Sequence, residues 1–205
     1  MKKGSIKGRI IKNLSNIPGY RTNRHLVILE SDDWGSIRMP SRETFNILLR
    51  EGIDWHSDGG YRFNRNDSLA TTEDLASLFE VLSSVVDSTG RPVVLTPVSL
   101  TANPDFIKIR NSDFTEYYYE PFTATLQRYK GCENSFKLWQ EGIEKRLFVP
   151  QFHGREHLNV RVWMNALKGN HEKVRHAFKY GMWGISTSDD PEIGVELQAA
   201  FDFIN

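Results

Sequence analysis

The chain of 205 residues has only one cysteine, Cys132, and its formal net charge at pH 7 is zero. A single cysteine cannot form an internal disulfide bond, so the fold does not require an oxidising compartment. A chain without net charge has no overall field that attracts polyanions. We therefore do not expect nucleic acid among its partners.

Long apolar segments are also missing. No run approaches the roughly 20 apolar residues of a membrane-spanning helix, so we expect no integral membrane segment. The first 24 residues are basic but lack the apolar core of a signal peptide, which favours a cytoplasmic location. A short amphipathic helix at 6–14 leaves peripheral membrane association open, and a solvated basic tail explains the same residues.

The remaining chain alternates apolar runs with segments of helical periodicity. Short apolar runs predict buried strands at 25–31, 91–100, 147–152 and 181–187. Capping residues and apolar spacing predict helices at 41–52, 71–90, 135–146, 159–169 and 172–181. This alternation predicts an α/β domain built on a parallel sheet. The residues between these elements at 54–71 and 105–135 are expected to be a loop and a long irregular insertion.

Acids and histidines follow two of the predicted strands. Asp32 and Asp33 come after the first strand, and His153 and His157 come after the third. Chemistry in parallel α/β folds collects at the carboxyl ends of the strands, so we expect these side chains to converge. Two imidazoles and one carboxylate form a common three-ligand zinc set. A second carboxylate off the metal is suited to accept a proton from water.

These two motifs resemble those of the polysaccharide deacetylases, a family of metal-dependent carbohydrate esterases. The family has an Asp-Asp motif after its first strand and a His-x-x-x-His motif after a later one. The resemblance implies a distorted, incomplete (β/α) barrel that hydrolyses N- or O-acetyl groups on a polysaccharide or oligosaccharide. It implies that Asp32 is the catalytic base and that Asp33, His153 and His157 bind a divalent transition metal, for which we expect zinc.

The chain departs from the family pattern at several positions. Glu30-Ser31 replace the usual Thr-Phe, Trp34 precedes Gly35, and Gly154 stands where Ser or Thr is usual. The family's Arg-x-Pro segment and late histidine, which acts as the general acid, have no match. We therefore expect residues 25–205 to be a deacetylase-like domain that is truncated at its C-terminus, preceded by a basic segment at 1–24.

Residues near these motifs are candidates for supporting roles. Loop aromatics could stack on a sugar, or simply pack within the domain: Trp34, Trp55 and Tyr61. Glu156 is a candidate partner that orients a histidine, or else a solvated acid. Asn159 could have the same role, or could cap the helix that follows it.

Two other functions remain open from the sequence. Residues 153–157 also fit the H-x-x-E-H motif of the inverted zinc proteases, in which the glutamate is the base. A non-catalytic carbohydrate-binding domain that kept the fold is the other alternative, and Gly154 and the missing later motifs favour it. The sequence does not specify the sugar, the acyl group or the oligomeric state.

Overall fold

The computed structural model describes residues 25–55 and 58–198, with only the backbone at 58–60, and a few earlier positions: Lys7, Ile11, 14–15, 17–20 and 22–23. Most of the predicted basic segment at 1–24 lies outside the described residues. Residues 199–205 of the predicted domain lie outside them as well.

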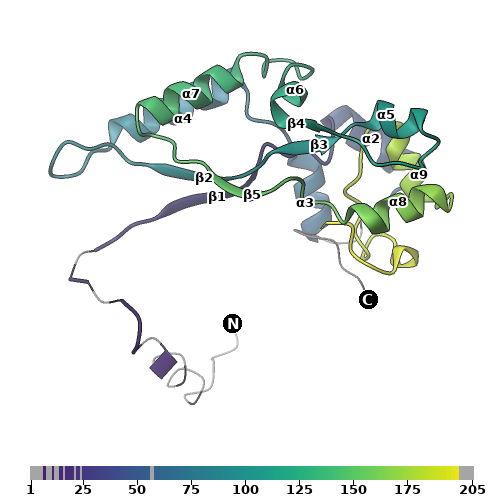
Figure 1. Ribbon diagram of the computed structural model, residues 1–205, viewed down its shortest axis with the longest axis horizontal. Coiled ribbons are helices and arrows are strands. Elements are labelled where there is room, and N and C mark those ends of the chain that lie inside the picture. Colours follow the sequence, from purple (N-terminus) through teal and green to yellow (C-terminus); the bar gives the residue numbers. More distant parts are fainter. Residues whose placement is uncertain are drawn as a thin grey trace.

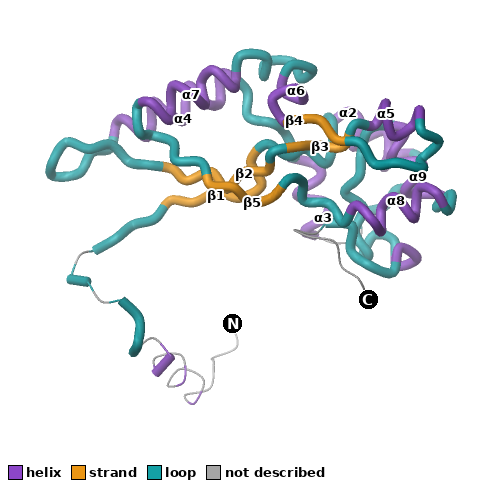
Figure 2. Tube along the Cα trace, viewed as in Figure 1, coloured by secondary structure: helices purple, strands orange, loops and turns teal. Residues whose placement is uncertain are grey.

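A parallel sheet of three strands confirms the predicted α/β class. The strands are β1 (Leu29–Trp34), β2 (Leu95–Leu100) and β5 (Gln151–Gly154), and they lie in the order β1-β2-β5 (Figure 2). Among the described residues the sheet is open at both edges and does not close into a barrel. A second, antiparallel pair joins β3 (Ala102–Pro104) to β4 (Tyr119–Pro121).

The helices fall into two groups around the sheet. Their bounds are α2 (Arg42–Arg50), α3 (Asp58–Asn66), α4 (Thr72–Ser84), α5 (Phe106–Asn111), α6 (Phe122–Leu126), α7 (Ser135–Glu144), α8 (Val160–Lys168) and α9 (Glu172–Lys179), followed by the 3-10 helix η1 (Pro191–Ile193). In Figure 1, α4 and α7 lie together over the sheet, while α2, α5, α8 and α9 gather beyond its carboxyl end. None of the helices in the described part of the chain has the length and apolarity to cross a membrane.

Two predicted helix starts are confirmed by their caps. The Ser41 hydroxyl accepts a hydrogen bond from the backbone N–H of Thr44 at 3.0 Å and caps α2. Thr71 and Asp74 form a capping box at the start of α4. The predicted end of α4 near Gly90 is wrong, because the extended Val85 ends the helix directly after Ser84.

The predicted loop at 54–71 is also wrong, since it contains α3. Gly59 and Gly60 have weak helix propensity, and this hid the helix in the sequence. Tertiary contacts stabilise it instead. Tyr61 packs edge-to-face on Phe45, and the side-chain amide of the buried Asn64 donates to a backbone carbonyl of the 181–186 segment at 3.4 Å.

Two further predictions need correction. The insertion at 105–135 is not irregular, because it contains α5, β4 and α6. The apolar segment at 181–187 is not a strand, although Met182, Trp183 and Ile185 in it are buried. These side chains fill the core that α8 and α9 share with α2. The segment is apolar because it is buried in this core, and it does not pair with any described strand of the sheet.

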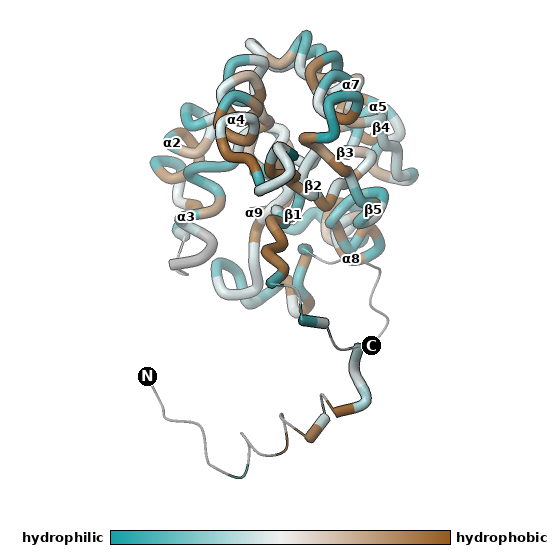
Figure 3. Tube along the Cα trace, turned by 90° about the vertical axis from the view of Figure 1, so that its left-hand side faces the viewer, coloured by the Kyte–Doolittle hydropathy of each residue, from teal (hydrophilic) through white to brown (hydrophobic). Residues whose placement is uncertain are grey.

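The predicted buried strand at 25–31 is shorter and more exposed than expected. β1 begins at Leu29, and Val27 before it is 87% exposed. Figure 3 shows a hydrophobic stretch leading into β1, and Figure 1 shows the described chain just before β1 running away from the helices. β1 lies at an edge of the sheet and pairs only with β2 among the described strands. Apolar composition alone cannot distinguish such an edge from a central strand.

Candidate metal centre

The two aspartates lie in a bulge at the carboxyl end of β1. Ser31 pairs with Pro97 and Trp34 pairs with Ser99, so β1 holds one more residue than β2 between these pairs. Asp33 has a φ of 60°, in the left-handed region that Asp tolerates better than most residues. Such bulges redirect side chains and often lie beside functional sites.

The backbone after the bulge is fixed by its neighbours. The Asn103 side chain accepts from the N–H of Ile37 at 3.0 Å and donates to the carbonyl of Gly35 at 2.9 Å. Gly35 has a φ of 87°, and a Cβ added there would lie 2.5 Å from the Leu100 carbonyl oxygen. This close approach to the end of β2 requires glycine, and it fixes the chain just after Asp33.

The two histidines lie at the carboxyl end of β5, as predicted. His153 is within the strand, and His157 is in the loop between β5 and α8. Backbone N–H groups of Thr101 and Ala102 donate to this loop, the latter to the carbonyl of Arg155 at 2.7 Å. The imidazole rings stack with their centroids 5.2 Å apart and their planes at 16°.

Asp33, His153 and His157 each offer a ligand atom, and these three atoms lie within 4.8 Å of one another. Asp33 Oδ1 is 3.7 Å from His153 Nε2, which is less than twice a zinc–ligand bond of about 2.0–2.2 Å. Each residue also has a buried polar atom without a hydrogen-bond partner among the described residues: Asp33 Oδ1, His153 Nε2 and His157 Nδ1. Buried polar atoms normally have partners, so this group fits a divalent transition metal.

Asp32 differs from Asp33 in its exposure. Its side chain is 65% exposed, against 36% for Asp33. Asp32 Oδ1 accepts from the backbone N–H of Asp33 at 3.0 Å and lies 3.5 Å from His153 Nε2. Asp32 is therefore beside the ligand group and open to solvent, which suits a group that exchanges protons.

Burial also affects two titratable groups around the centre. Desolvation lowers the pKa of His157, against the opposing effect of Asp33, and so favours the neutral form that binds metals. Desolvation raises the pKa of Asp67, although its Oδ2 accepts from the N–H groups of Arg38 and Met39. Asp67, Asp33 and His157 line one cavity of about 20 Å³. No sequence motif singled out Asp67.

The three predicted sugar-stacking residues do not line one common pocket. Trp34 lines a pocket of about 720 Å³ beside Asp32 and Asp33, and its ring packs on Trp139 and Phe148. Trp55 is 5% exposed and stacks on Phe45 in the core. Tyr61 also packs against Phe45, edge to face, and does not line the pocket. Trp55 and Tyr61 are therefore packing residues rather than a platform.

The two predicted supporting residues have other partners. Both carboxylate oxygens of Glu156 accept from the guanidinium of Arg155, at 2.5 and 2.6 Å, and Glu156 forms no hydrogen bond with a histidine among the described residues. The Arg155 guanidinium lies 4.4 Å from the ring centroid of Tyr119. Asn159 caps α8 by accepting from the N–H of Val162 at 3.3 Å, the alternative role considered for it.

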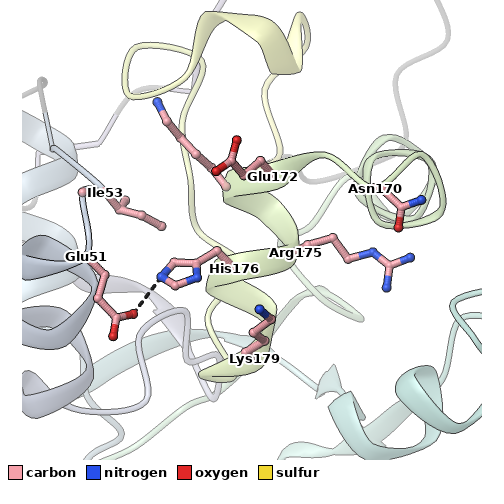
Figure 4. Close-up of a pocket in the computed structure, with 9 residues that line it drawn as sticks. Glu51, Ile53, Asn170, Glu172, Arg175, His176 and Lys179 are labelled. Atoms are coloured by element: carbon pink, nitrogen blue, oxygen red, sulfur yellow. Dashed lines mark ion pairs between the residues drawn. The ribbon is translucent and has the colours of Figure 1, made fainter.

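A second group with metal-binding residue types lies beside α9. It consists of His171, Asp190 and Glu192. A separate pocket of about 560 Å³ lies nearby between α9 and the end of α2 (Figure 4). In that pocket His176 Nε2 lies 2.8 Å from Glu51 Oε2, and the dashed line in Figure 4 marks this contact.

No protein-family model, curated protein or solved structure matches the chain.

Proposed function

We propose that the chain is a metal-dependent hydrolase that removes N- or O-acetyl groups from a polysaccharide or oligosaccharide. The observation that carries this proposal is the set of partnerless buried atoms on Asp33, His153 and His157. They come from β1 and from the end of β5, two parallel strands that flank β2. We further propose that the three-stranded sheet is part of a distorted, incomplete (β/α) barrel of the deacetylase type.

Asp33, His153 and His157 would hold the metal, and Asp32 would act as the base. A zinc ion held by these residues would lower the pKa of water and polarise an acyl carbonyl. Asp32 accepts the proton of the attacking water, whose oxygen bonds to the acyl carbon. The bond from that carbon to the sugar nitrogen or oxygen then breaks. The proton passes to the leaving amine or hydroxyl, and acetate is released.

The local fold argues against the protease alternative. The motif at 153–157 starts in a strand and crosses a loop, and α8 begins only at Val160. Glu156, which would be the protease base, has both oxygens bound to Arg155. Pairing with a guanidinium makes a carboxylate less basic, whereas Asp32 is exposed and lies 3.5 Å from His153 Nε2, so Asp32 is the better base.

Replacing each of the two aspartates in turn with asparagine tests the proposal. Asp32→Asn should keep bound zinc at the wild-type level while deacetylation of an acetylated oligosaccharide falls by at least about 100-fold. Asp33→Asn should lose both metal and activity. The measurements are elemental analysis of purified protein and acetate release. Metal loss in Asp32→Asn with metal retained in Asp33→Asn would reverse the two roles, and wild-type protein without stoichiometric metal would favour the non-catalytic carbohydrate-binding domain.

A further inference from the structure

The candidate metal centre opens into a pocket that α3 helps to form. The pocket of about 720 Å³ is lined by Asp32 and Asp33, and on α3 by Arg62, Phe63 and Asn66. The spacing of these three residues places them on one face of the helix. The volume is within the range of sites for ligands of several rings, and it exceeds what one acetyl group needs.

Phe63 is an unusual residue on this wall. It is 62% exposed, whereas Tyr61 on the same helix packs against the core. The guanidinium of Arg38 lies 5.4 Å from the Phe63 ring centroid, which is within the range of a cation–π contact. This contact fixes the ring at the pocket while most of its surface stays open. Exposed large apolar groups in a groove are typical of ligand sites.

The charged side chains that line the pocket differ in whether they already have hydrogen-bond or ion-pair partners. Asp67 accepts two backbone N–H groups, and Asp74 is held in the capping box of α4. Arg62 is exposed and forms no ion pair with another described residue. A ring with an open face beside an exposed guanidinium can bind the C–H face and the polar groups of a sugar together.

We propose that this wall of α3 is a subsite for a second sugar unit, next to the acetylated unit at the metal centre. Phe63 stacks on the ring of that second sugar, and Arg62 donates hydrogen bonds to its hydroxyl or carboxylate groups. The inference rests on the proposed deacetylase function for the identity of the first unit. It implies that the substrate is an oligosaccharide or polymer rather than a monosaccharide.

Binding to a protein without turnover tests the subsite. The Asp32→Asn protein, with its metal content measured, is titrated calorimetrically with N-acetylglucosamine and its tetramer, and with acetylated xylose and its tetramer. For at least one pair the tetramer should bind more tightly than the monomer. Adding Phe63→Ala should weaken tetramer binding about tenfold and leave the monomer affinity unchanged. Phe63→Tyr should retain tetramer binding. Val81→Ala is the matched control, because Val81 is also 62% exposed and lies on α4 outside the pocket.

The outcomes separate this inference from the proposed function. Tetramer affinity that is unchanged by Phe63→Ala, or no tetramer preference in either pair, overturns the subsite. Deacetylation with the same KM for the tetramer in wild-type and Phe63→Ala proteins overturns the subsite and leaves the deacetylase standing. Tetramer binding that depends on Phe63, in a wild-type protein that releases no acetate, supports the subsite and overturns the deacetylase.

Discussion

Two groups of histidine and carboxylate residues in the described part of the chain have the composition of metal sites, but their surroundings differ. Their members are Asp33, His153 and His157 at the sheet, and His171, Asp190 and Glu192 beside α9. In the second group Asp190 Oδ2 lies 3.8 Å from both His171 Nε2 and Lys173 Nζ, and Asp190 caps η1. Asp33 has no lysine or arginine within 4.0 Å among the described residues.

We infer that a neighbouring cation, rather than residue type, distinguishes the two groups as metal sites. Lys173 already compensates the charge of Asp190, and a metal ion would have to displace it. Both ring nitrogens of His171 also lack a hydrogen-bond partner among the described residues, as do Asp33 Oδ1, His153 Nε2 and His157 Nδ1, so the contrast between the groups rests on Lys173. We therefore expect a metal at the sheet group and none at the group beside α9.

The largest expected difference between the two groups is in zinc affinity after one histidine is removed from each. His153→Ala should lower zinc affinity by more than about 100-fold, because even the loss of an outer-shell partner costs about 10–100-fold. His171→Ala should leave zinc affinity and stoichiometry unchanged. Calorimetric titration of the metal-free proteins measures both. If the two variants lose zinc to the same extent, the assignment of the site to the sheet is wrong.

The features that the sequence predicted best are those with a local signal. The starts of the helices at 41 and 71 were predicted from capping residues, and the hydroxyls of Ser41 and Thr71 do bond to backbone N–H groups only three residues away. The metal group was predicted because parallel strands bring their carboxyl ends together, so Asp33 and the two histidines had to meet at one edge of the sheet.

The features that it missed depend on distant contacts. α3 exists because Tyr61 and Asn64 pack on α2 and the 181–186 segment, and nothing near the two glycines signals this. Trp55 lies in a segment with the composition of a loop, and only its stacking on Phe45 places it in the core. Glu156 is a different case, because its partner Arg155 is the adjacent residue, and adjacency alone does not predict a side-chain pair.

The two groups also differ in how strictly the backbone beside them requires glycine. Gly35 beside the sheet group and Gly194 beside the second group both have positive φ, at 87° and 73°. A Cβ at Gly35 would meet the Leu100 carbonyl oxygen at 2.5 Å, whereas a Cβ at Gly194 has no atom within 4 Å among the described residues. Gly35→Ala should therefore lower the free energy of unfolding by about 2 kcal/mol more than Gly194→Ala, from overlap beyond the shared left-handed strain. Denaturant unfolding measures it, and equal losses would contradict the close approach.

A smaller effect is expected in the pH dependence of the free energy of unfolding of the metal-free protein. Burial lowers the pKa of His157 below its ordinary value of 6.5. Below that pH the unfolded chain binds more protons than the fold does, so the free energy of unfolding should decrease as the pH falls from about 6.5 to the pKa of folded His157. His157→Gln should reduce this loss, and the contribution of His157 should persist in His171→Gln. Zinc affinity should weaken over the same range, because protons compete for the ligand. A loss of the same size in wild type and His157→Gln would contradict the lowered pKa.

The smallest expected effect is at Gly154, where the chain departs from the deacetylase pattern. A Cβ there would lie 3.4 Å from Leu100 Cδ2 and 3.7 Å from the Glu156 carbonyl oxygen, which is ordinary contact, and Gly154 does not have a positive φ. Gly154→Ser should therefore change the free energy of unfolding by less than about 1 kcal/mol, and zinc affinity by less than about threefold. Unfolding and zinc titrations of this variant beside Gly35→Ala would show which of the two glycines the centre requires. A loss of zinc in Gly154→Ser would mean that the loop carrying His157 has no room for the hydroxyl, and that glycine at this position is a requirement of the site.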